Sequence, residues 1–212
     1  MITITVKGLA NFMTASPRRQ RKIVHDFKYP ADDESAAQQK YYHEARTVIS
    51  AYHKKGHPPK WLLRHADALQ DLASHNTGRG RQRLNHNARA VRSYHEHFSA
   101  ARFQLLDKVT LTFDSANVRV KVTPDLHVTE NGQEKIIKLE FTSNQPDARI
   151  IKIVSQIMYE SANHGGITLP SAAILYYDVP RGAVYKGARC RARMLGDIQA
   201  SCQTIEDIWR TI

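Results

Sequence analysis

Residues 122–143 read VTPDLHVTENGQEKIIKLEFTS and contain the pattern that decides the fold. Asn131 and Gly132 form a strong two-residue hairpin signal, because both residue types tolerate the positive φ that a type I′ turn requires. The residues on either side alternate between apolar and polar and are rich in β-branched types. The stretch therefore predicts two antiparallel strands joined by a tight turn.

The turn also sets the register between the two strands. Counting outward from it pairs Glu130 with Gln133, Asp125 with Lys138, and Thr123 with Glu140. One face is then apolar and contains Val122, Pro124, Leu126, Val128, Ile137, Leu139 and Phe141. The other face carries Asp125, Lys138, Glu140 and Thr142. Two carboxylates on a diagonal, roughly 7 to 8 Å apart at the backbone, suit a divalent cation, whereas the alternative is an amphipathic hairpin with its charged face in water.

Segments on both sides of the hairpin extend it into a mixed fold. A further strand over 109–113 would make 109–113, 118–129 and 134–142 a three-stranded antiparallel meander. Apolar residues at helical spacing predict a helix over 147–162, and a strand over 172–179 and a short terminal helix follow. The expected fold class is α+β (α/β).

The first half of the chain is expected to be mostly helical. A β-like alternation over 2–6 precedes a basic run that ends at Pro30. Apolar positions repeat at helical spacing over 36–55, and 60–74 and 83–106 also predict helices. We assign 1–106 to a basic helical region and 107–212 to a sheet core, the two forming one compact unit.

Positive charge is the clearest feature of the composition. The 212 residues include 31 Lys and Arg against 20 Asp and Glu, a formal net charge of +11. Between His75 and Arg102, six arginines accompany one acid, Glu96. Such an excess favours a polyanionic partner, nucleic acid first, and makes Arg79, Arg81 and Arg83 candidate phosphate contacts. The plainer interpretation is a basic face that is merely solvated.

Cysteine and apolar content limit the remaining classes. Two cysteines, Cys190 and Cys202, exclude a disulfide framework and a cysteine-rich zinc site, and leave either free thiols or one bridge. No stretch approaches the roughly 18 apolar residues of a membrane span, and the start lacks the order of a signal peptide. We expect a cytoplasmic protein that does not bind membranes, and protein partners cannot be named from the sequence.

Two motifs in this chain resemble those of the PD-(D/E)XK nuclease superfamily. They are Val122-Thr123-Pro124-Asp125 and, about fourteen residues later, Ile136-Ile137-Lys138-Leu139-Glu140-Phe141-Thr142-Ser143. Gln156-Ile157-Met158-Tyr159 is similar to the glutamine-and-tyrosine helix of the RecB-like exonuclease branch. The resemblance covers roughly 107–180, with 36–55 as the first core helix and the basic helices as an insertion. It implies a restriction-endonuclease-like core that hydrolyses phosphodiester bonds in nucleic acid, DNA being favoured.

The resemblance also implies a catalytic set. In that superfamily an aspartate and a glutamate bind one or two magnesium or manganese ions, and Asp125 and Glu140 match them. A lysine two residues after the glutamate orients or activates the attacking water, but Thr142 stands at this position and supplies no positive charge. Lys152, on the stripe of the next helix that it shares with Gln156, is predicted to replace it, with Lys138 as the alternative.

Supporting residues follow from the same resemblance. Glu44 is the predicted upstream metal ligand, since it flanks the apolar stripe of its helix while His43 points nearly opposite. Arg149, Gln156 and Tyr159 are predicted to contact the nucleic-acid backbone or to brace the site.

Two further functions stay open at this point. The spacing in Arg89-Ala-Val-Arg-Ser-Tyr-His95 loosely matches that of helical ribonucleases. A catalytically inactive nucleic-acid-binding or adaptor protein could also use the same scaffold. Thr142 favours this last interpretation, whereas Asp125 and Glu140 on one face oppose it.

Overall fold

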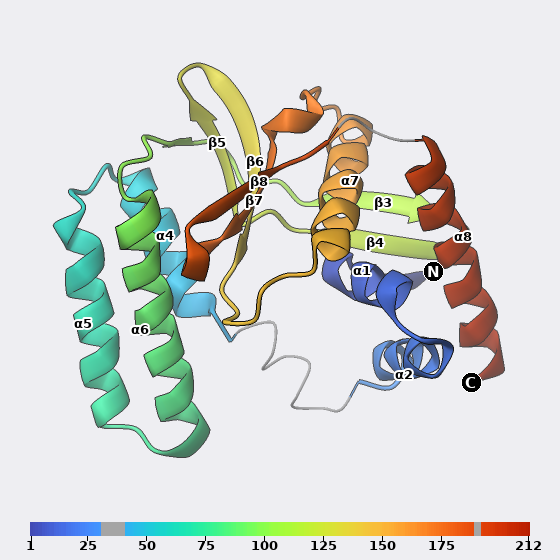
Figure 1. Cartoon of the computed structure of the whole chain (residues 1–212), viewed down its shortest axis with the longest axis horizontal. Helices are drawn as coiled ribbons and strands as arrows, with labels where there is room; N and C mark the ends of the chain where they lie inside the picture. Colours follow the sequence, from blue (N-terminus) through green and yellow to red (C-terminus); the bar gives the residue numbers. More distant parts are fainter. Residues whose placement is uncertain (31–40, 189–191) are drawn as a thin grey trace.

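Two β-sheets with helices around them make up the protein (Figure 1). The computed structural model describes residues 1–30, 41–188 and 192–212. The strands are β1 Ile2–Thr5, β2 Gln104–Leu105, β3 Leu111–Ser115, β4 Val118–Val122, β5 Leu126–Glu130, β6 Gln133–Glu140, β7 Ile174–Asp178 and β8 Ala183–Lys186. The helices are α1 Val6–Thr14, α2 Pro17–Lys28, α4 His43–Lys54, α5 Lys60–Ser74, α6 Gly78–Phe98, α7 Ala148–His164 and α8 Ala192–Thr211, with short 3-10 turns η1 Ser171–Ala173 and η2 Val179–Arg181. The predicted α+β class is confirmed.

The larger sheet has the strand order β2-β5-β6-β7-β8. Its β5–β6 hairpin turns on Asn131 and Gly132, which have φ values of 52° and 75°, and Glu130 pairs with Gln133 as predicted. β6 then runs parallel to β7 through the crossover helix α7. The predicted order of hairpin, helix and strand is therefore present.

The predicted meander was wrong. β3 and β4 pair with each other and with β1 in a separate three-stranded sheet. The segment 118–129 is split, because Pro124 has no amide to donate to a strand ladder and the chain changes sheets between Val122 and Leu126. The strand that precedes β5 in the larger sheet is instead β2, which lies in a segment predicted to be helical.

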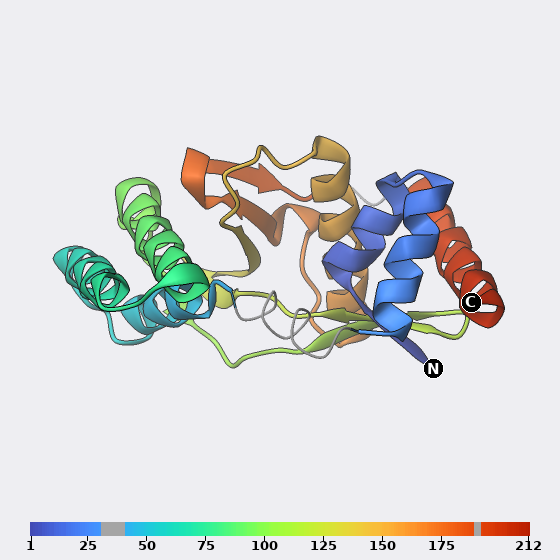
Figure 2. The same ribbon diagram turned by 90° about the horizontal axis from the view of Figure 1, so that it is seen from below.

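Both faces of the larger sheet are buried. The first core joins one face to α7 and to the three-stranded sheet with α1, α2 and α8, whereas the second core joins the opposite face to α4, α5 and α6 (Figures 1 and 2). Strand β6 serves both, since Ile136 lies in the first core and Ile137 in the second. The face that carries Asp125 and Glu140 is therefore covered by protein, and the alternative of a charged hairpin face in water was wrong.

Most residues of the predicted apolar face of the hairpin lie together in one core. Leu126, Val128, Ile137, Leu139 and Phe141 share the second core. Val122 departs from the set, because it belongs to β4 and lies in the first core. The residue before the sheet change thus faces a different set of helices.

The helices match the sequence unevenly. α5 has the predicted bounds and α7 nearly so, while α4 falls within 36–55, whose residues 36–40 lie outside the described residues. α6 begins and ends earlier than the predicted 83–106, and α8 is 20 residues long rather than short. None of the described helices is long and apolar enough to cross a membrane. Cys202 is a free, buried thiol, and Cys190 lies outside the described residues.

Residues 6–14 and the basic run that follows them form α1 and α2, which the sequence did not predict as helices. Thr5 caps α1 through its side chain, which accepts a hydrogen bond from the Gly8 amide, and Pro17 occupies the first turn of α2, where a missing amide costs nothing. β1 places this region against the rest of the molecule by pairing in parallel with β4. β1 lies before the predicted domain boundary at residue 106 and β4 lies after it, so both sides of that boundary contribute strands to one sheet.

Candidate functional site

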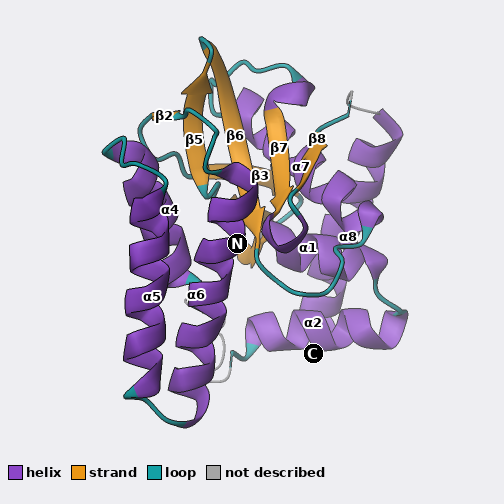
Figure 3. Ribbon diagram, turned by 60° about the vertical axis from the view of Figure 1, so that its left-hand side comes forward, coloured by secondary structure: helices purple, strands orange, loops and turns teal. Residues whose placement is uncertain are grey.

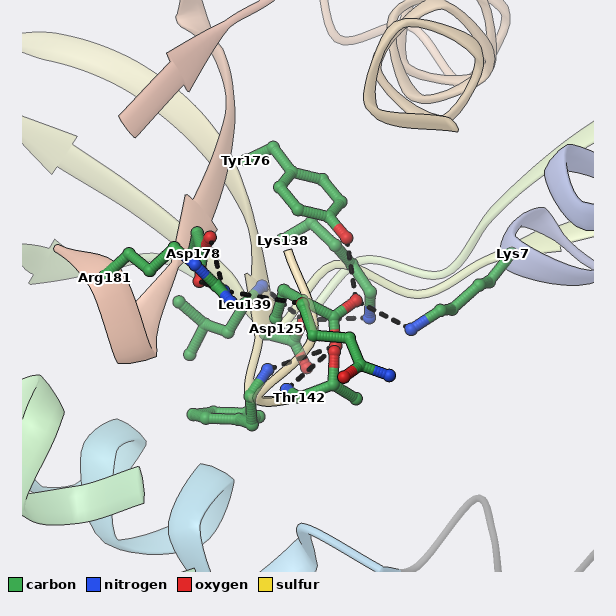
Figure 4. A network of polar contacts seen from close by, with 11 residues as sticks. Lys7, Asp125, Lys138, Leu139, Thr142, Tyr176, Asp178 and Arg181 are labelled. Atoms are coloured by element: carbon green, nitrogen blue, oxygen red, sulfur yellow. Dashed lines mark hydrogen bonds and ion pairs between the residues drawn. The ribbon is translucent and has the colours of Figure 1, made fainter. Parts of the chain in front are cut away.

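The candidate site lies where β5 begins and β6 ends, on the face of the sheet that points toward the first core (Figure 4). Asp125 precedes β5, and its amide donates to the carbonyl of Ile137 at 3.0 Å. Glu140 is the last residue of β6. The predicted register therefore places both carboxylates on one face.

Asp125 is a buried carboxylate held from two sides. Its Oδ1 accepts a hydrogen bond from Arg46 Nε at 2.6 Å, and its Oδ2 lies 2.8 Å from Lys138 Nζ and accepts from the Leu139 amide at 2.8 Å. Its side chain is only 5% exposed. Burial alone would raise the pKa of Asp125, but Lys138 and Arg46 outweigh it and hold the pKa below its ordinary value. The group is therefore ionised.

Glu140 is held by a different set of donors. Its Oε2 accepts from Lys7 Nζ at 2.6 Å and from the Tyr176 hydroxyl at 2.7 Å, and its Oε1 accepts from the amides of Phe141 and Thr142 at 3.2 Å each. Burial opposes ionisation here too, yet Lys7 and these hydrogen bonds lower the pKa of Glu140 to about 2. Glu140 also carries its charge in the folded protein.

Lys7 is the residue that sequence reasoning missed. It lies on α1, 133 positions before Glu140, and its side chain is 48% exposed (Figure 4). A single lysine in the otherwise uncharged segment Val6–Thr14 was the available signal, but the pairing of β1 with β4 that brings α1 to the site is not readable from local pattern. Arg46 of α4 was also missed, because its contact with Asp125 joins segments 79 positions apart.

A third acid, Asp178, lies next to Glu140 on the sheet. The two residues are register partners of β6 and β7, and Asp178 is fully buried. Both of its oxygens accept from Arg181 Nη1, at 3.2 and 3.0 Å, and Arg181 also donates to the carbonyls of Ser143 and Asn144. This pair fastens the loop that follows Glu140 to the end of β7.

The structure places Glu44 and Lys152 apart from this cluster. Glu44 on α4 forms an ion pair with Arg83 of α6, and its Oε2 is buried without a hydrogen-bond partner among the described residues. Lys152 is exposed on α7, with no ion pair in residues 1–30, 41–188 and 192–212. No group of three His, Cys, Asp or Glu side chains converges as a metal site in the described part of the chain.

The predicted nucleic-acid contacts have different surroundings. Arg79, Arg81 and Arg149 are exposed, whereas Arg83 is half-buried and tied to Glu44. Gln156 is buried and donates to Glu160 at 2.8 Å, and Tyr159 packs against the first core. The three exposed arginines are thus the members of the predicted set that a phosphate can reach directly.

The donor set fits a hard divalent cation. Magnesium commonly uses one or two carboxylates and completes its shell with water and phosphate oxygens. Asp125 Oδ2 and Glu140 Oε2 each have one lysine ammonium as partner, Lys138 and Lys7, and the two ammonium charges together equal that of one such ion. Arg46 and Tyr176 would still hold the carboxylates once these lysines moved aside.

Comparison of the sequence with models of protein families and with curated proteins gave no match.

Proposed function

We propose that the protein is a metal-dependent nuclease, with magnesium or manganese held by Asp125 and Glu140 and with DNA as the favoured substrate. The observation that carries the proposal is the pair of buried, ionised carboxylates on one sheet face, beside the half-exposed Lys7. The order of hairpin, crossover helix and parallel strand agrees with the restriction-endonuclease-like core that the motifs imply.

The cost of burying these charges supports a functional role. Each ion loses several kcal/mol of hydration on burial, and a buried ion pair seldom stabilises a protein more than an apolar replacement would. Perturbed carboxylates in such a cluster are more common at functional sites. Other positions on the same sheet face are occupied by apolar residues, such as Ile136 and Ile174 in the first core, so this face does not need charged residues in order to pack.

In this proposal Lys7, rather than Lys152, supplies the positive charge that is missing because Thr142 stands at the position of the superfamily's lysine. Its Nζ already contacts Glu140, and its exposed side chain can turn toward a phosphate. Positive charge placed where negative charge develops in the transition state is commonly the largest catalytic contribution. Thr142 contributes through its amide, which holds Glu140 Oε1.

The remaining residues position the carboxylates. Arg46 fixes Asp125 through Oδ1 and Tyr176 fixes Glu140 through Oε2, and these two carboxylates would hold the ion. When bound, the metal acidifies a water molecule and offsets phosphate charge. Lys7 then stabilises the attacked phosphate, while exposed arginines such as Arg79 and Arg81 bind the flanking backbone.

The test is cleavage of labelled single- and double-stranded DNA and RNA with magnesium, manganese or chelator. We expect metal-dependent cleavage that Asp125→Asn and Glu140→Gln each reduce by at least about a hundredfold, because each removes a metal ligand. Asp114→Asn is the control, since Asp114 forms an exposed pair with Arg119 on the other sheet. Equal activity of all four proteins would refute the assignment.

A second candidate is binding of nucleic acid without cleavage. The favouring observation is that three cations, Arg46, Lys138 and Lys7, surround two carboxylates, while Thr142 stands where the superfamily has lysine. Tight binding by the natural protein without cleavage in either metal, and unchanged by chelator, would select this function.

A further inference from the structure

Helix α2 carries a strongly basic surface that the proposed catalytic site does not use. Arg18, Arg19, Arg21 and Lys22 are all exposed. Residues 1–29 contain six Lys and Arg and a single acid, Asp26. This excess equals that of the 75–102 segment, so most of the net charge of the chain comes from two regions far apart in the sequence.

The positive charge on α2 is not neutralised within the described residues. Lys22 is the only one of the four exposed cations with an ion pair there, to Asp26 at 3.2 Å, and both side chains are more than half exposed. Such a surface pair contributes at most about 1 kcal/mol. Among residues 1–30, 41–188 and 192–212, the three exposed arginines therefore have no acidic partner.

The apolar side of α2 is already used by the fold. Val24 is buried, and Ile23 and Phe27 pack against the first core, which also includes α1 and α8. A basic amphipathic helix that binds a membrane needs its apolar face free to enter the lipid. Charge is therefore what α2 offers to a partner, and this favours a polyanion in solution over a lipid surface.

The position of α2 adds a second observation. Figures 1 and 2 place α2 and the start of α6 on opposite sides of the loop that leaves β6, the strand that ends in Glu140, and Figure 3 shows both helices below the end of this strand. The start of α6 carries the exposed Arg79 and Arg81, which have no ion pair in residues 1–30, 41–188 and 192–212. Two exposed basic helices therefore flank the candidate site.

We propose that α2 is a second contact surface for the nucleic-acid backbone, so that one strand or duplex is held by α6 on one side of Glu140 and by α2 on the other. The two-sided arrangement rests on the proposed function, but phosphate binding by α2 does not require cleavage. A linear polyanion is the ligand that satisfies two separate basic surfaces at once. Each bound phosphate releases counterions, so binding should weaken steeply with salt.

The experiment measures binding of fluorescent 12- and 40-nucleotide DNA and RNA, single-stranded and duplex, over a salt series without metal. The variant is Arg18→Ala/Arg19→Ala/Arg21→Ala. The control is Lys54→Ala/Lys55→Ala/Lys60→Ala. It removes the same charge near the start of the helical hairpin formed by α5 and α6, where α4 meets α5 and away from the start of α6 (Figure 1). We expect the α2 variant to weaken binding of the 40-mer at least about tenfold and to flatten the log-log salt slope by about 0.9 for each duplex phosphate that the variant no longer binds.

The control variant should bind with nearly natural affinity. Equal weakening by both variants would mean that charge acts without a defined surface, and no weakening by the α2 variant would exclude this surface; either result overturns the proposal. Loss of binding to vesicles of anionic lipid, with nucleic-acid binding intact, would assign α2 to membranes instead. Weaker binding by the α2 variant in a protein that does not cleave would retain this surface while the nuclease proposal fails.

Discussion

At the scale of single residues, the main feature is a set of charges buried in pairs. Asp125 combines two cations with one backbone amide, and Glu140 combines one cation with two amides, which compensates for the lost hydration. The two sites differ in access, because Lys138 is 20% exposed and Lys7 is 48% exposed. Glu140 is therefore the carboxylate whose cation can leave most readily.

Lys7→Ala tests the role of that cation. Because Lys7→Ala leaves the buried Glu140 without its cation, the substitution should cost the fold about 1 to 3 kcal/mol, whereas cleavage should fall at least about tenfold because transition-state charge is no longer offset. Lys7→Arg, which keeps the charge, should recover part of the rate. Urea unfolding and initial cleavage rates measure the two effects.

Lys135→Ala is the matched control, because Lys135 forms a comparable pair with Glu130 on the same hairpin, at its turn end. If both lysine variants lost activity to the same degree, Lys7 would have no special part in the reaction. If the activity of Lys7→Ala fell only in proportion to its stability, the ion pair with Glu140 would be structural.

At the scale of elements, the sequence correctly predicted the turns and helices that depend on residues close together in the chain. The Asn131-Gly132 turn and the period of α5 are local patterns, and both were confirmed. The prediction of one strand over 118–129, which contains Pro124, was wrong. An alternation of period two does not indicate which sheet each part of the segment joins. Lys7, Arg46 and Asp178 reach the site through pairing of distant segments, for which a single sequence carries no signal.

A buried hydrogen bond between α4 and α6 gives the second core a pH dependence. His53 Nε2 lies 2.7 Å from the Tyr94 hydroxyl, and burial lowers the pKa of His53 to about 4 although Glu130 opposes the shift. The unfolded chain, with an ordinary histidine pKa near 6.5, binds a proton more readily. Stability from this residue is thus fully present above about pH 6.5 and falls as the pH drops toward 4.

We expect the free energy of unfolding to fall by roughly 3 kcal/mol from this source between pH 7 and pH 4. His53→Gln, which can still bond Tyr94 but does not titrate, should show a smaller acid destabilisation than the natural protein in urea unfolding. His43→Gln is the control, an exposed histidine on the same helix. Identical pH profiles for the natural protein and His53→Gln would contradict the assignment.

At the scale of the whole molecule, the larger sheet joins the two cores. Each strand that crosses the middle of the sheet places alternate residues in opposite cores, as Ile136 and Ile137 do on β6 and Ile174 and Leu175 on β7. A cavity on either face therefore disturbs strands that both cores need. Cooperative unfolding of the two cores as one unit is the expected consequence.

The two tryptophans make this testable, because Trp61 packs against the second core and Trp209 against the first. In Trp61→Phe and Trp209→Phe proteins, each remaining tryptophan reports one core, and we expect their urea transitions to coincide. Adding Ile136→Ala to each should lower the free energy of unfolding by about 2 to 5 kcal/mol in both fluorescence signals, although the cavity opens in the first core alone. Two separated transitions, with only the Trp209 signal shifted, would instead mean that the helical hairpin folds as a unit of its own and that α6 can move relative to α2.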